Sequence, residues 1–183
     1  MREQRSEKYA PTPWQVPVAV ENVAETGARF DLVADAQVRA AVARMAGLRD
    51  LPRLEASFDV TRRGAGGLRV AGRVSATVGQ VCVVTLEPLA SEVEESVDLL
   101  FVPQLAAERE DGETDTRGEN VDETEPLIGG LVDLGALAVE FLILGLDPYP
   151  RKPGAAFQPP PEAKPDESPF AALASLKKGP DEH

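Results

Sequence analysis

The stretch LEASFDVTRRGAGGLRVAGRVSATV, residues 54–78, decides the fold, because polar and apolar side chains alternate on both sides of a glycine-rich turn. Such alternation is typical of strands with one buried and one wet face. The apolar positions are Leu54, Ala56, Phe58 and Val60 before the turn, and Leu68, Val70, Val74, Ala76 and Val78 after it. The segment RGAGG, residues 63–67, supplies residues that tolerate positive φ, as a hairpin needs.

A third strand is predicted in LASEVEESVDLLFV, residues 89–102. Its inward positions are Leu89, Val93, Val97, Leu99 and Phe101, and its outward ones are Glu92, Glu94 and Asp98. The neighbouring strand turns Arg69 and Arg73 outward, so we expect cross-strand ion pairs worth about 0.2–1 kcal/mol each.

Shorter elements precede the hairpin. The segments 17–23 and 28–34 read as strands, and in the second Phe30 and Leu32 alternate with charged neighbours. Asp35 is the expected N-cap of a helix to about Ala46, and Gly47 follows as its stop. The expected apolar stripe is Val38, Ala41, Val42 and Met45.

A second helix is predicted from Asp133, its N-cap, to Gly145. Asp133, Ala136 and Glu140 form a narrow polar stripe on it, which suits either a catalytic carboxylate or a face turned to water, and the second needs no unpaired buried charge. The apolar window 127–146 could span a bilayer, but Asp133 and Glu140 make it a helix of a soluble protein.

Two segments resist a globular interpretation. Residues 104–125 carry nine acids and two arginines, so we expect a disordered acidic loop. Residues 151–183 form a proline-rich tail with a short helix at 168–178, whose Phe170, Leu173 and Leu176 share one side. That helix is too short to be stable alone, and docking on its own domain or in a partner's groove both remain open.

These segments define the predicted organisation. A flexible arm, residues 1–13, precedes a single α+β domain at 14–150, and the tail follows. The expected architecture is an antiparallel sheet or partly closed barrel packed on one or two helices.

Composition restricts the function. The net charge of −12 disfavours phosphate backbones and anionic membranes and favours a basic partner. The lone histidine is His183, so we expect no histidine-based triad or zinc site, and we expect no cofactor. One cysteine excludes an internal disulfide, and no signal peptide is visible, so the expected location is the cytoplasm.

Three motifs in fixed order carry a resemblance to a known family. They are D-L-x(5)-E-x-x-x-L-x-L from Asp133, P-x-P-R-x-P-G from Pro148 and S-P-F-A-x-L-x-x-L-K from Ser168. Over about residues 14–178 the chain resembles the large ribosomal RNA subunit accumulation proteins, the YceD family. The resemblance implies a role in the synthesis, processing or stability of large-subunit ribosomal RNA, and association with a ribosomal protein.

The resemblance also implies a C-x-x-C pair, which here is Cys82 followed by Thr85. A zinc or redox role needs paired thiolates, so it does not carry over. The β-branched neighbours of Cys82 predict a buried strand, in which the thiol has a raised pKa and is inert.

We therefore expect a non-enzymatic factor that binds a basic ribosomal protein or the pre-ribosomal large subunit. The candidate partner-binding residues are Asp133, Glu140, Arg151, Lys152, Phe170, Leu173 and Leu176. Two alternatives stay open. One is a metal-dependent RNA-processing hydrolase using acids such as Asp111 and Asp115. The other is an RNA-binding hairpin, whose candidates are Arg62, Arg63, Arg69 and Arg73, although direct binding should be weak.

Overall fold

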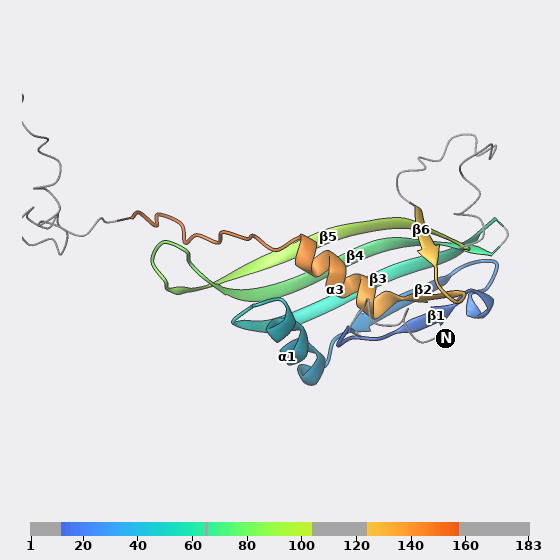
Figure 1. The fold of residues 1–183 in the computed structure, drawn as a ribbon, viewed down its shortest axis with the longest axis horizontal. Helices are drawn as coiled ribbons and strands as arrows, with labels where there is room; N and C mark the ends of the chain where they lie inside the picture. The colour runs from blue at the N-terminus through green and yellow to red at the C-terminus, as the bar shows by residue number, and fades with distance from the viewer. Residues whose placement is uncertain (1–11, 65, 104–123, 158–183) are drawn as a thin grey trace, which may run out of the picture.

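The computed structural model describes residues 12–64, 66–103 and 124–157. These residues form a five-stranded sheet, in the order β2-β3-β4-β5-β6, a two-stranded sheet of β1 and β7, and two α-helices. The strands are β1 Pro17–Ala19, β2 Ala28–Val33, β3 Asp50–Arg63, β4 Gly67–Val81, β5 Pro88–Pro103, β6 Thr124–Leu127 and β7 Leu131–Asp133, and the helices are α1 Ala36–Met45 and α3 Leu134–Leu144. Helix α3 crosses β4 and β5 while α1 packs beside β3 (Figure 1). The prediction of an α+β fold is confirmed.

The central hairpin of β3 and β4 follows the predicted alternation, and every apolar position named for it is buried. Phe58 lies opposite Gly72 in the antiparallel register. A Cβ atom at Gly72 would stand 2.0 Å from the carbonyl oxygen of Ser57 and 2.9 Å from the Cα of Phe58. Gly72 therefore lets the two strands approach closely where the largest fully buried side chain, Phe58, enters the core.

The sheet is mixed and open, which corrects the expectation of an antiparallel sheet or partly closed barrel. Strand β6 runs parallel to β5, with Thr124 beside Leu100 and Leu127 beside Pro103. A parallel neighbour needs a long connection, and residues 104–123 stand between these two strands in sequence. Strands β2 and β6 are the edges of the described sheet, so it does not close on itself.

Two predicted boundaries are wrong by a few residues. The acidic run was expected to stay a loop through residue 125, but Thr124 and Glu125 belong to β6, because their backbone pairs with β5 and Leu127 is buried. The strand expected at 17–23 ends at Ala19, and Val20–Asn22 form a 3-10 turn. The rest of the acidic run, 104–123, lies outside the described residues.

Helix α1 begins and ends as predicted. The Asp35 carboxylate accepts a hydrogen bond from the Val38 N–H at 2.8 Å, and Gly47 has a positive φ of 67°. The predicted apolar stripe is wrong at Met45, which is 49% exposed, whereas Ala43 is buried beside Val42. The buried stripe is thus rotated, because the helix contacts β3 along its Val42–Ala43 side.

Helix α3 is tied to the N-terminal strand through its predicted cap. The Asp133 Oδ1 atom accepts hydrogen bonds from Gly135 N at 3.0 Å, Ala136 N at 3.1 Å and Val16 N at 2.8 Å. The Leu134 N–H donates in turn to the Val16 carbonyl at 3.0 Å. A Cβ atom at Gly135 would stand 2.7 Å from the Trp14 carbonyl oxygen, so the glycine lets the chain cross the helix start.

The domain limits proposed from the sequence remain predictions. Residues 1–11 of the expected arm and 158–183 of the tail, with its short helix, lie outside the described residues. Residues 151–157 form neither helix nor strand. Neither helix in the described ranges is long and apolar enough to cross a membrane.

The Asp133 cap predicts that two substitutions at this position differ in their effect on stability. Asp133→Ala should lower the free energy of unfolding by about 1–3 kcal/mol, because it removes the helix cap and leaves the Val16 N–H without its acceptor. Asp133→Asn keeps an acceptor oxygen and should lose less. Urea denaturation followed by circular dichroism measures both, with Glu140→Gln on the exposed side of α3 as the control. Equal stability of Asp133→Ala and the control would contradict this role.

Candidate binding surfaces at the two ends of helix α3

The outer face of the central strands is a ladder of ion pairs, as predicted. Arg69 donates to both carboxylate oxygens of Asp98, at 2.8 and 2.6 Å, and Arg73 pairs with Glu94. Arg53 on β3 donates to Glu92 at 2.8 Å. Exposed pairs of this kind contribute little stability, on the order of 0–1 kcal/mol each. Because of these pairs, Arg53, Arg69 and Arg73 already have carboxylate partners.

The remaining two RNA-binding candidates are placed at the end of the hairpin. Arg62 donates to the backbone carbonyls of Val23 at 2.6 Å and Glu21 at 3.0 Å, so it fastens the segment before β2. Arg63 is exposed. Hydrogen bonds from Arg69, and more weakly the charge of Arg63, hold the pKa of Asp98 below its ordinary value. The four arginines therefore do not form a free cationic stripe.

A groove beside the first half of α3, called the α3 groove below, gathers two of the predicted partner-binding residues. Asp133 and Glu140 both line it, with Ala136 between them. Its volume is about 480 Å³. The other residues that line it are Thr12, Gln15, Pro17, Phe101, Pro126, Ile128, Leu131, Val132 and Leu137.

The α3 groove combines exposed apolar side chains with carboxylates. Ile128 and Leu131 are 68% and 47% exposed, and they pair with each other in an isolated β-bridge, so their apolar surfaces adjoin. Glu140 is exposed on α3. Strand β6 carries the exposed Glu125 and joins the groove through Pro126. In the sequence it directly follows the acid-rich residues 104–123. This combination suits a partner that is both apolar and cationic.

Ile128 and Leu131 were not predicted from the sequence as site residues, although the sequence contains a signal for them. Gly129 and Gly130 have positive φ angles of 63° and 74°, and they turn the chain so that Ile128 and Leu131 bridge each other. A Gly-Gly pair between apolar residues is a hairpin signal. It was hidden inside a stretch whose high hydropathy indicated a buried helix.

The structure does not bring Arg151 and Lys152, two other partner-binding candidates, to the α3 groove. Lys152 lies near the turn between β4 and β5, where its Nζ atom is 2.9 Å from Glu87 Oε2 and lowers the pKa of that carboxyl. Arg151 is exposed beside it. Phe170, Leu173 and Leu176 lie outside the described residues, as do Asp111 and Asp115 of the hydrolase alternative.

Cys82 lies in this same turn, which corrects its assignment to a strand, whereas its predicted burial is confirmed. Strand β4 ends at Val81, and the turn closes through Leu86 N to Cys82 O at 2.9 Å, with Leu86 at φ 59°. Cys82 exposes no surface but is outside the apolar core cluster. Its sulfur accepts hydrogen bonds at 3.4 Å from the N–H groups of Thr85 and Lys152. The sulfur therefore helps to fasten the chain after α3 to the turn.

The prediction of a raised thiol pKa is also wrong. Hydrogen bonding from the Thr85 side chain, then from the backbone N–H groups of Lys152, Thr85 and Val84, lowers the pKa of Cys82 to about 6. Burial acts in the opposite direction but is the weaker effect at this peripheral site. The Thr85 hydroxyl also lies 3.3 Å from Glu87 Oε2, a long and weak alternative partner. The residue at the second position of C-x-x-C thus acts as a hydrogen-bond donor to the first.

Within the described ranges, no three histidine, cysteine, aspartate or glutamate side chains gather as metal ligands would. The described residues form grooves and exposed ion pairs at the surface.

A family model described as "Large ribosomal RNA subunit accumulation protein YceD" matches residues 70–177. No curated protein matches the chain. No solved structure matches it either.

The Cys82 environment predicts a measurable titration. Absorbance at 240 nm reports thiolate formation, and Cys82 is the only cysteine, so the folded full-length protein should titrate with a midpoint near pH 6. Thr85→Val should move that midpoint upward, because it removes the main donor.

The same shift links pH to stability. The folded pKa is below the unfolded one, so the stability difference between the native protein and Cys82→Ala should grow from about pH 6 to pH 9 and become constant below pH 6. Chemical denaturation across this range measures it. A midpoint near 9 in the folded protein, with a flat difference from Cys82→Ala, would contradict the assignment.

Proposed function

Since the chain belongs to the family of large ribosomal RNA subunit accumulation protein YceD, we propose that it acts as a binding factor that holds a cationic, partly apolar segment of a large-subunit ribosomal protein in the α3 groove. The description of the family ties it to accumulation of the large ribosomal RNA and names no enzyme activity. Holding such a protein until it is placed on the ribosomal RNA would support that accumulation.

The observation that carries the proposal is the juxtaposition of exposed Ile128 and Leu131 with Glu140 in one groove. Apolar contacts at the floor would supply affinity, because burying exposed apolar surface is favourable by about 25 cal/mol per Å². Carboxylates at the rim would select a cationic partner and speed its approach. The acid-rich residues 104–123 directly precede β6 in the sequence and add to the net negative charge of the chain.

Charge also separates this proposal from direct RNA binding. The net charge of −12 repels a phosphate backbone, and on the outer face of the described strands Arg53, Arg69 and Arg73 are each paired with a carboxylate. A phosphate would have to displace those partners. A cationic peptide at the α3 groove meets no such competitor among the described contacts of Glu140.

A binding experiment tests the proposal. Immobilised full-length protein is incubated with total protein extracted from large ribosomal subunits, and retained proteins are identified by mass spectrometry at 50 and 300 mM salt. We expect basic ribosomal proteins to be retained at low salt and lost at high salt. Glu140→Lys and Ile128→Asp should each weaken binding of the purified retained protein by roughly tenfold, about 1.4 kcal/mol.

The matched control is Asp59→Lys, which makes the same charge change on the opposite face of the sheet at an exposed position. It should bind like the native protein. Retention that is equal in Glu140→Lys and the native protein would place the partner elsewhere and end the proposal for this groove.

The RNA-binding alternative makes an opposite prediction. Retention of large-subunit ribosomal RNA by the isolated protein should be weak at physiological salt, and the double variant Arg63→Ala, Arg73→Ala should not change it. Arg62 is left intact because it fastens the segment near Val23. A filter-binding assay in which this variant lost most of its RNA would favour the hairpin as an RNA site.

A further inference from the structure

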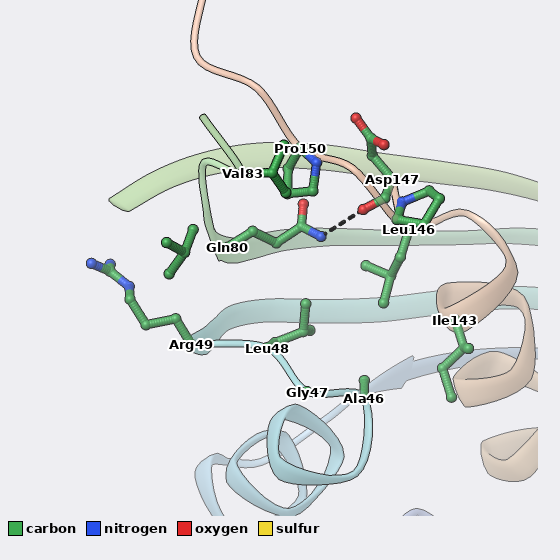
Figure 2. A pocket seen from close by; sticks show the side chains of 12 residues that line it. Ala46, Gly47, Leu48, Arg49, Gln80, Val83, Ile143, Leu146, Asp147 and Pro150 are labelled. Atoms are coloured by element: carbon green, nitrogen blue, oxygen red, sulfur yellow. Dashed lines mark hydrogen bonds between the residues drawn. The ribbon is translucent and has the colours of Figure 1, made fainter. Parts of the chain in front are cut away.

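A second hollow lies at the other end of α3. It has a volume of about 620 Å³ and is bordered by the loop after α1, the end of β4 and the chain that leaves α3. Figure 2 shows Leu48, Val83, Ile143 and Leu146 around it, with Pro150 above. Gln80 spans one side by donating to the Asp147 carbonyl at 2.9 Å.

The walls of this hollow expose apolar surface. Val81, Val83 and Ile143 are 43%, 46% and 41% exposed. Val81 is the last residue of β4, Val83 follows it in the turn, and Ile143 belongs to α3. Three half-exposed branched side chains around one depression are the kind of surface that another segment covers. The covering segment must bring apolar side chains that fit between two helix ends and a strand end.

The chain itself leads from this hollow to such a segment. Pro148 and Pro150 form part of the wall, and Val83 N donates to the Pro150 carbonyl at 2.9 Å. Lys152 is then held by Cys82 and Glu87, so the point of departure is fixed. Beyond Phe157 the sequence continues for 26 residues, and it includes SPFAALASLKK at 168–178.

The geometry allows this segment to return. Residues 151–157 can carry the chain at most about 25 Å from Pro150, and the ten residues 158–167 can span about 33–36 Å. The connecting stretch therefore reaches back to the hollow with length to spare. Its proline content favours an extended connection.

Charge and pattern match as well. Phe170, Leu173 and Leu176 share one side of the predicted helix, Asp166 and Glu167 precede it, and Lys177 and Lys178 end it. The hollow has Arg49 at one end, where it pairs with Asp50 at 2.7 Å, and Asp147 toward the other (Figure 2). A helix running from the α1 side to the α3 side would place its lysines near Asp147, and its own dipole favours cations at that end.

We propose that residues 168–178 form a helix that docks in this hollow of their own chain, with Phe170, Leu173 and Leu176 against Val81, Val83 and Ile143. An eleven-residue helix, about 16 Å long, is marginal alone, so docking and helix formation occur together. The docked helix closes the end of the molecule opposite the α3 groove. The α3 groove remains open to a partner. The docking proposal does not depend on the proposed function.

Hydrogen exchange of the full-length protein tests the docking. The double variant Phe170→Ser, Leu173→Ser should speed exchange of the amides at 81–84 and 143–146 by about fivefold, because their cover is lost. Ala171→Ser lies on the opposite side of the predicted helix and should leave both segments unchanged. Docking that protects about fivefold adds about 1 kcal/mol to the free energy of unfolding, so the double variant should lower the denaturation midpoint only slightly and leave the domain folded.

Two further measurements identify the occupant. Sedimentation should show a monomer. Hydrogen-exchange protection of the two segments should not change when the protein is diluted, as an intramolecular contact requires. Protection that fades on dilution would assign the hollow to a second copy and overturn the proposal. Protection seen only after adding total large-subunit ribosomal protein would assign it to a partner, and exchange unaffected by the double variant would leave the hollow without this helix. Each result is separable from binding at the α3 groove, which Glu140→Lys reports.

Discussion

The hydrogen bonds to one oxygen of Asp133 join the N-terminal segment at Val16 to the first turn of helix α3. The Oδ1 atom receives two N–H groups of the first turn of α3 and the N–H of Val16, from a segment more than a hundred residues earlier in the chain. Helix ends leave such donors without intrahelical partners, and a carboxylate also complements the helix dipole. This one contact fixes where α3 starts on the sheet. The α3 groove and the hollow at the other end of α3 both lie along this helix, so their positions follow from where it starts.

The distribution of charge explains why an acidic protein still has specific surfaces. On the outer face, cations and anions alternate across neighbouring strands and cancel each other, as Arg69 does with Asp98. The α3 groove differs, because Glu140 stands there beside exposed Ile128 without a cation among its described contacts. Uniform negative charge would give only general attraction for basic molecules. Carboxylates next to exposed apolar side chains give a place where one kind of basic segment fits better than others.

Local sequence patterns predicted much of the fold. Alternation at 54–78 identified the hairpin, and Asp35 and Asp133 identified two helix starts, because each signal acts within a few residues. The parallel pairing of β6 with β5 was not predictable, since no local pattern reports a partner across residues 104–123. Cys82 was misjudged for a related reason. Its apolar neighbours predicted a core strand, whereas its environment is set partly by Lys152, seventy positions away. Of the candidate site, the sequence identified Asp133 and Glu140 but missed Ile128 and Leu131, whose exposure depends on the turn at Gly129 and Gly130.

The pairing of β1 with β7 sets the order in which the chain can fold during its synthesis. The three long strands β3, β4 and β5 are consecutive, so their antiparallel contacts can form as soon as they leave the ribosome. Strand β1 is made earlier than all of them, yet its partner residues, Leu131–Asp133, emerge after all of them. The first strand must wait while the meander forms without it. Translation of the final third is then the event that completes the domain.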